Sequence, residues 1–108
     1  MLTLEQIKKE VVDVARANRA HRAILFDSYA RGTATNRSDV DLIFIEDTTE
    51  PFLKWLDRYF YPLSDRFGGG VETLVYTPDE LDRISHRPFI QQALREGIVL
   101  YEHRKEES

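Results

Sequence analysis

Two carboxylates one residue apart stand at the start of an apolar run. Asp39 and Asp41 open the segment DVDLIFI (39–45), whose apolar remainder predicts a β-strand. Because strand side chains alternate between faces, residues two apart point the same way, with Cα atoms about 6.5 Å apart. Two acids on one face can hold the same cation. Without a positive charge between them the arrangement is costly, since like charges repel and buried carboxylates lose hydration.

The segment just before this strand has features of a phosphate-binding turn. Residues 21–26 predict a first strand, and Ser28 to Gly32 predict a short helix that ends at Gly32 in a left-handed conformation. A helix that begins just beyond a strand offers unpaired backbone N–H groups to phosphate. Ser28 adds a hydroxyl donor.

The remaining elements predict an α/β (α+β) fold, a small mixed sheet of about four strands flanked by helices, in one domain over residues 1–108. Glu72 lies near the start of the third predicted strand, as the paired acids do in the second. A first helix is expected at 3–19, with a capping box formed by Thr3 and Gln6. A second begins at Pro51 and is broken or kinked by Pro62. A third covers 79–84, with Thr77 as its N-cap, and a fourth runs from Pro88 until Gly97 stops it. The third and fourth strands are predicted at 71–76 and 98–101. A glycine turn is predicted at 68–70 and a charged tail at 103–108.

The aromatic residues between 52 and 67 allow two interpretations, a base-stacking surface or core packing. Their spacing near 3.6 residues favours the core. The stripe predicted for the helix after Pro88 consists of Phe89, Ile90, Ala93 and Leu94.

Composition limits the possible partners. With 15 basic and 19 acidic residues the net charge is −4, which gives no extended nucleic-acid surface. There is no cysteine, so thiolate metal sites and disulfides are excluded. The longest apolar run is too short to cross a bilayer, and we expect a cytoplasmic protein with no membrane partner.

The order of these residues resembles a known family. A strand, Ser28 at a helix start, Arg31 with Gly32, and then the segment SDVDL (38–42) are similar to the nucleotidyltransferase superfamily that includes DNA polymerase beta. The closest resemblance is to the minimal nucleotidyltransferases, small proteins often encoded beside a HEPN-domain partner. The ending RPFIQQALREGIVLYE (87–102) is similar to the closing helix and strand of that family.

The resemblance implies roles for individual residues. Asp39 and Asp41 match the two acids that hold divalent metals, and Glu72 matches the third acid, usually Asp. Ser28 matches the residue that contacts the distal phosphates of the nucleotide, and Arg31 is a further candidate for phosphate binding. Two Mg²⁺ ions are the implied cofactors, and an NTP, with ATP expected, is the implied substrate.

Asp27 departs from the family pattern, which has glycine before the serine. Asp tolerates a left-handed conformation, so the turn itself can form. Its charge would repel a triphosphate by about 1–4 kcal/mol, depending on the local dielectric. Asp27 is therefore placed in the nucleotide site as a residue that either weakens nucleotide binding or binds a cation.

Two functions follow from these interpretations. The first is a Mg²⁺-dependent transferase that moves an NMP group, with AMP expected, from an NTP to a hydroxyl acceptor, which the resemblance places on a HEPN toxin partner. The second is a catalytically impaired module that restrains such a partner. In a chain this small, the predicted sheet leaves one rim open where the acids gather. This also suggests that a partner or a second subunit completes the site. Against both, each acid taken singly could face solvent or pair with Arg22, Arg31 or Arg37.

Overall fold

The computed structural model describes residues 1–48 and 50–103, and its centre is a four-stranded sheet. The strand order is β3-β2-β1-β4. β2 runs parallel to β3, whereas β1 is antiparallel to both β2 and β4. The strands are β1 (Arg22–Phe26), β2 (Val40–Ile45), β3 (Val71–Tyr76) and β4 (Ile98–Glu102). The mixed sheet and the edge position of the last strand are confirmed.

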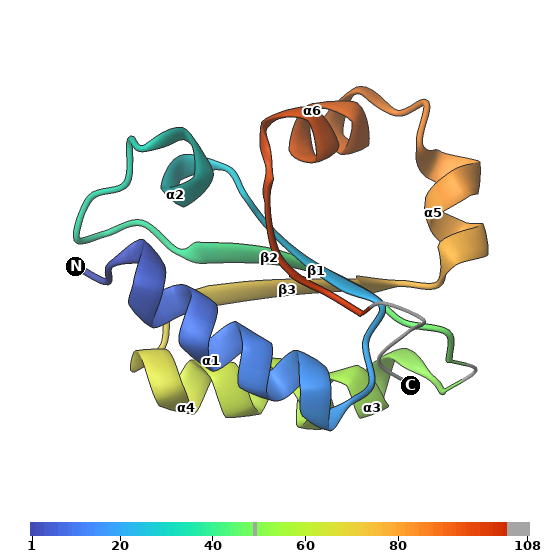
Figure 1. The fold of residues 1–108 in the computed structure, drawn as a ribbon, viewed down its shortest axis with the longest axis horizontal. Coiled ribbons are helices and arrows are strands. Elements are labelled where there is room, and N and C mark those ends of the chain that lie inside the picture. The colour runs from blue at the N-terminus through green and yellow to red at the C-terminus, as the bar shows by residue number, and fades with distance from the viewer. Residues whose placement is uncertain (49, 104–108) are drawn as a thin grey trace.

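Helices cover both faces of this sheet (Figure 1). One face packs against α1 and α4 and the other against α5 and α6, while the one-turn helix α2 follows β1 directly. The helices are α1 (Leu4–Ala17), α2 (Ser28–Arg31), α3 (Phe52–Trp55), α4 (Tyr61–Phe67), α5 (Pro78–Ile84) and α6 (Pro88–Glu96), with a π-helical turn, η1 (Leu56–Phe60), between α3 and α4. None of the helices in the described part of the chain is long and apolar enough to span a membrane.

Strand β2 is buried along its whole length. Leu42 and Phe44 belong to the core formed with α1 and α4, and Ile43 and Ile45 belong to the core on the other face. Because strand side chains alternate, Asp41 lies on the same face as Ile43 and Ile45. The fold therefore turns this acid toward the side of the sheet that carries α5 and α6.

Local signals set most of the helix ends. Thr3 with Gln6, and Thr77 with Glu80, form complete capping boxes at α1 and α5, as predicted. Gly32 ends α2 with φ 77° and ψ 20°, in the left-handed conformation expected for it.

Of the two outcomes predicted for Pro62, a break or a kink in the helix, the break does not occur. Helical backbone continues through Pro62 to Phe67, because the π-helical turn just before it changes the hydrogen-bonding register, and the N–H of Tyr61 bonds to the carbonyl of Leu56. Proline cannot donate to the carbonyl four residues earlier, that of Arg58. Asn18 supplies the missing donor, with its Nδ2 at 3.0 Å from that oxygen.

One prediction about α6 is wrong. Ile90 and Ala93 are buried as expected, but Phe89 and Leu94 are exposed. Gly97 ends α6, as predicted, with an extended backbone. A Cβ there would lie 2.4 Å from the carbonyl oxygen of Ala93 and 2.7 Å from Cγ2 of Ile24, so glycine is needed because the helix end approaches β1 closely.

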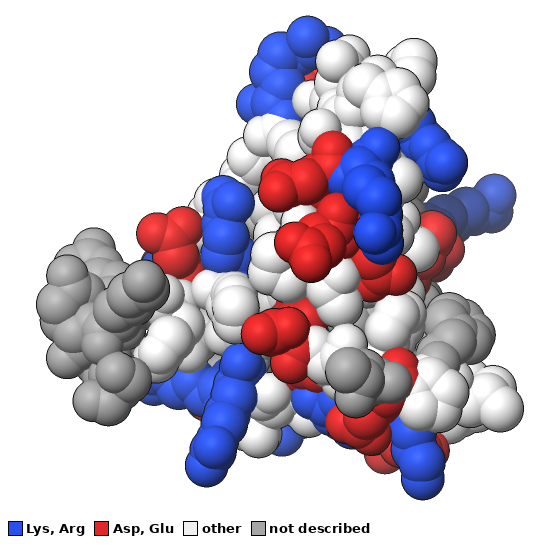
Figure 2. Space-filling model, turned by 90° about the vertical axis from the view of Figure 1, so that its right-hand side faces the viewer, with Lys and Arg blue, Asp and Glu red and all other residues white. Residues whose placement is uncertain are grey.

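The aromatic residues after β2 mostly serve the core, as predicted. Tyr59 is fully buried, and Trp55, Phe60 and Phe67 pack against the same cluster, whereas Tyr61 is exposed. The side chain of Phe52 and the tail residues 104–108 lie outside the described residues. On the side of the molecule that carries α5, Lys and Arg side chains are interspersed with Asp and Glu, without a continuous basic surface (Figure 2).

Candidate active site

Asp41 lies at the point where three strands bring polar residues together. In the sheet register it pairs with Phe26 of β1, the residue before Asp27, and with Glu72 of β3. Its side chain is only 8% exposed and shares a hydrogen bond with that of Glu72. The sheet therefore joins two of the three predicted acids directly, although they lie 31 residues apart in the sequence.

The surroundings of Asp41 favour its protonated form. Burial raises its pKa from 3.8 to about 7, and the charge and hydrogen bond of Glu72, followed by the charges of Asp27 and Asp39, act in the same direction. Asp41 therefore retains its proton up to near pH 7, and its protonated carboxyl group can donate the hydrogen bond to Glu72.

No arginine or lysine in the described part of the chain forms an ion pair with Asp39, Asp41 or Glu72. The alternative in which these acids pair with nearby arginines is therefore not found among the described residues, whereas Asp39 and Glu72 are exposed to solvent, as that alternative also allowed. Arg22 pairs with Glu102 at 3.3 Å, and Arg31 pairs with Asp27 and Glu96.

Asp39 is exposed and lines a separate cavity of about 540 Å³ beside the Gly68–Gly70 turn. The N–H of Val40 bonds to the carbonyl of Gly70 at 2.7 Å, which fixes Asp39 against this turn. Within residues 1–48 and 50–103, no three His, Cys, Asp or Glu side chains are placed to hold a metal ion together. The structure thus joins Asp41 with Glu72 and leaves Asp39 beside them.

The donor set nevertheless suits magnesium. Mg²⁺ prefers hard oxygen ligands and usually takes one or two protein carboxylates, with water and phosphate oxygens completing its octahedron. Asp41 and Glu72 are such a pair, and a bound cation would replace the proton that Asp41 otherwise retains. Asp39, the residue directly before β2, is the next available oxygen donor.

Asp27 holds an unusual backbone conformation at the turn into α2. Its φ of 63° is positive, as the sequence allowed, whereas its ψ of −142° lies outside the left-handed helical region. This combination of φ and ψ is essentially restricted to glycine and costs other residues about 1–3 kcal/mol. The turn therefore forms with an aspartate in a conformation that favours glycine. Ser28 follows it, half-buried, at the first position of α2, the helix start predicted for it.

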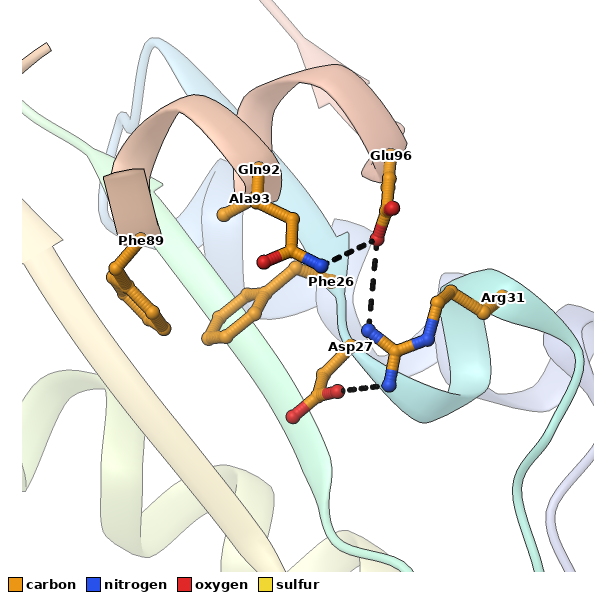
Figure 3. Close-up of a pocket in the computed structure, with 7 residues that line it drawn as sticks. All are labelled: Phe26, Asp27, Arg31, Phe89, Gln92, Ala93 and Glu96. Atoms are coloured by element: carbon orange, nitrogen blue, oxygen red, sulfur yellow. Dashed lines mark hydrogen bonds and ion pairs between the residues drawn. The ribbon is translucent and has the colours of Figure 1, made fainter. Parts of the chain in front are cut away.

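Arg31 reaches back along α2 to Asp27 (Figure 3). Its Nη2 is 2.6 Å from Oδ1 of Asp27, and its Nη1 is 3.5 Å from Oε2 of Glu96 at the end of α6. These three residues line a cavity of about 110 Å³, together with Gln92 and apolar side chains from β1 and α6. The cation that the sequence allowed for Asp27 is thus this arginine.

Sequence reasoning missed Glu96 and Gln92 in this cavity. The available signal was Gly97: a glycine that lets a helix end approach β1 brings the residue before it beside the Phe26–Asp27 turn.

It also missed the second buried acid, Glu46. Glu46 is 4% exposed and accepts hydrogen bonds from the hydroxyl of Tyr59 and from Nη2 of Arg58. Arg58 also donates to Oδ1 of Asn18 at 2.9 Å and to Oε1 of Glu50 at 2.6 Å. Burial and the hydrogen bond to Glu46 raise the pKa of Tyr59 above its usual range. This network lies at the other end of β2 from Asp41.

Comparison with known proteins gives one family match over nearly the whole chain. The model described as polymerase beta, nucleotidyltransferase matches residues 5–106, which confirms the resemblance found in the sequence. A Methanocaldococcus jannaschii protein named "Putative protein adenylyltransferase MJ0604" is 29% identical over 100 residues, covering 90% of this chain and 97% of the relative.

Solved structures share the fold. A toxin–antitoxin crystal structure with AMP-PNP superposes with a TM-score of 0.70 at 19% identity, covering 93% of this chain and 77% of that one. The tri-AMPylated Shewanella oneidensis HEPN toxin in complex with MNT antitoxin matches with a TM-score of 0.65 at 14% identity, covering 95% of this chain and 76% of that one. At these identities the matches show a common architecture.

Proposed function

The chain belongs to the polymerase beta nucleotidyltransferase family, and from this premise we propose that it transfers AMP from ATP to a hydroxyl group on a protein acceptor of the HEPN type. The observation that carries the proposal is the pairing of the buried Asp41 with the exposed Glu72, neither of which has a cationic partner among the described residues. The adenylyltransferase name of the M. jannaschii relative and the AMPylated HEPN toxin of the S. oneidensis complex support AMP as the group and a HEPN protein as the acceptor.

In this proposal, Asp39, Asp41 and Glu72 hold divalent cations, Mg²⁺ by their ligand chemistry and two by family resemblance. Bound there, the metal would supply positive charge beside the reacting phosphate. Ser28 and Arg31 bind the distal phosphates. The acceptor oxygen attacks the α-phosphorus, its bond to that atom forms as the bond to pyrophosphate breaks, and Glu72, more exposed than Asp41, accepts the hydroxyl proton. The expected cytoplasmic location is consistent with ATP as the donor.

The test is transfer of label from ATP. The protein is incubated with α-labelled ATP, Mg²⁺ and the HEPN protein encoded beside it, and Asp41→Asn is compared with Asp47→Asn, which changes an exposed acid beyond the far end of β2. We expect label on the partner with the wild type and Asp47→Asn, and at least a 100-fold loss with Asp41→Asn. Equal labelling by Asp41→Asn would overturn the proposed role of the acid pair.

One observation favours the second candidate, an impaired module that binds and restrains its partner. Asp27 places a carboxylate in the position of the family glycine, and it engages Arg31, the nearest candidate for phosphate binding. Partner binding by the wild type without label transfer, with transfer gained in Asp27→Gly, would support this candidate over the enzyme.

A further inference from the structure

Arg31 is shared between two carboxylates that come from different elements (Figure 3). Asp27 holds one guanidinium nitrogen at 2.6 Å and Glu96 the other at 3.5 Å, and Nε2 of Gln92 lies 3.4 Å from the same Glu96 oxygen. The three charged side chains are 35–50% exposed. Ion pairs with this exposure are weak, so another anion can compete for the arginine.

Glu96 is held in this position by the backbone. Gly97, the next residue, packs so closely on β1 that a Cβ would lie 3.1 Å from the carbonyl oxygen of Leu25 and closer still to Ala93 and Ile24. The end of α6 is therefore fixed against the strand that leads into Asp27 and Ser28. With the helix end held there, rotation of either side chain is the simplest way to separate Glu96 from Arg31.

The charges in this cluster do not balance. Asp27 and Glu96 carry two negative charges against the single positive charge of Arg31, and the acid pair at Asp41 lies on the neighbouring strand. As long as both carboxylates hold Arg31, this side of the site offers an incoming triphosphate no net positive charge. Arginine binds phosphate through two parallel hydrogen bonds, so the same guanidinium can serve either set of anions.

We propose that Asp27 and Glu96 form a clasp that competes with the phosphates of the nucleotide for Arg31, and that Glu96 is a positioning residue that sets nucleotide affinity. The proposal rests on the proposed function, which places the phosphates beside Ser28. It assigns a role to Glu96 and a cause to weak nucleotide binding: the arginine that would bind phosphate must first leave two carboxylates.

The test is the dissociation constant for ATP in the presence of Mg²⁺, measured by calorimetry on the full chain without a partner. Loss of one half-exposed ion pair corresponds to about a fivefold change in affinity, so Glu96→Gln is expected to bind ATP about five times more tightly than the wild type. Asp27→Asn is expected to gain about tenfold, because it also removes a negative charge beside the phosphates. Inorganic tripolyphosphate should show the same gains.

Two controls separate the clasp from a general effect of charge or structure. Glu102→Gln removes the same charge from another partly exposed ion pair, that with Arg22, and is expected to change the affinity less than twofold. In an Arg31→Ala background, Glu96→Gln should no longer improve binding, since the group it releases is gone. This dependence on Arg31 is a readout that a purely structural role of Glu96 would not give.

The clasp is overturned if Glu96→Gln binds ATP no more tightly than Glu102→Gln, if its gain persists without Arg31, or if no variant binds ATP measurably. Tighter ATP binding by Glu96→Gln without label transfer to any acceptor would support the clasp and overturn only the proposed transfer reaction. The two proposals therefore fail by different measurements.

Discussion

Strand β2 carries a buried acid at each of its ends, and the two have opposite surroundings. Glu46, just after the strand, accepts hydrogen bonds from Arg58 and Tyr59. Asp41, near its start, is similarly buried but contacts another acid, Glu72, and its pKa is raised to about 7 by burial and by three neighbouring carboxylates.

The comparison separates Glu46, whose hydrogen bonds stabilise the fold, from Asp41, whose burial beside other carboxylates costs stability. Burying a carboxylate is costly unless it is paired and hydrogen-bonded, and the chain meets this requirement for Glu46 with its own residues. For Asp41 the described residues supply no cation, and its raised pKa favours the protonated form. We therefore propose that an external cation would bind at this end of β2.

The first prediction concerns the pH dependence of stability. The folded-state pKa of Asp41 is about 7 and lies above its unfolded value of 3.8, so the folded chain retains a proton that the unfolded chain has lost between these two values. Stability is therefore expected to fall as pH rises from about 4 to about 7, by roughly 1.4 kcal/mol per pH unit and about 4 kcal/mol in total. Urea unfolding without divalent cations measures it.

Asp41→Asn is the control for this slope, because asparagine keeps the shape and does not titrate. The difference between the two pH profiles isolates the contribution of the carboxyl pair. Parallel profiles for the wild type and Asp41→Asn would mean that Asp41 titrates normally and that the contrast with Glu46 is false.

The second prediction compares the same chemical change, replacement of a carboxyl group by an amide, at both ends of β2. Glu46→Gln leaves Arg58 without its buried partner and is expected to lower the free energy of unfolding by about 3 kcal/mol. Asp41→Asn at pH 8 is expected to leave it unchanged or raise it, since a repelling charge is lost. Urea denaturation of both variants measures this, and a loss of stability in Asp41→Asn matching that in Glu46→Gln would remove the distinction between the two acids.

Sequence reasoning found the end of β2 where the signals are local. Alternation placed Asp41 on a strand, although β2 begins at Val40 and not at Asp39 as predicted. Capping boxes placed α1 and α5, and Gly32 ended α2 as expected. Each of these depends on residues within a few positions of one another, which is why they can be read from the chain.

What the sequence did not reveal depends on contacts across the chain. Glu46 was not singled out because its partners are 12 and 13 residues away on a π-helical turn, and that turn also carries the helix through Pro62, where Asn18 donates to the free carbonyl. The pairing of Arg31 with Glu96 spans 65 residues. The sequence allowed a left-handed backbone at Asp27, but it did not reveal the ψ of −142°, which lies where glycine is favoured.

The third prediction extends the comparison to Asp27, an acid that forms an ion pair with Arg31 but has a strained backbone. Asp27→Gly relieves the backbone conformation and is expected to raise the free energy of unfolding by about 2 kcal/mol, despite loss of the half-exposed ion pair with Arg31. Asp27→Ala, which loses the charge but keeps a Cβ, is the matched control and should not be stabilised. Thermal unfolding measures both, and equal stability of the Gly and Ala variants would show that the turn is not strained.

The most direct test of the central claim, that Asp41 requires a cation from outside the chain, is the effect of Mg²⁺ on the unfolding of the wild type and Asp41→Asn at pH 8. At a magnesium concentration about five times the dissociation constant, we predict that the free energy of unfolding of the wild type rises by about 1 kcal/mol, and that the rise is absent in Asp41→Asn and retained in Glu46→Gln. An equal rise in the wild type and Asp41→Asn, or none in the wild type, would contradict the account.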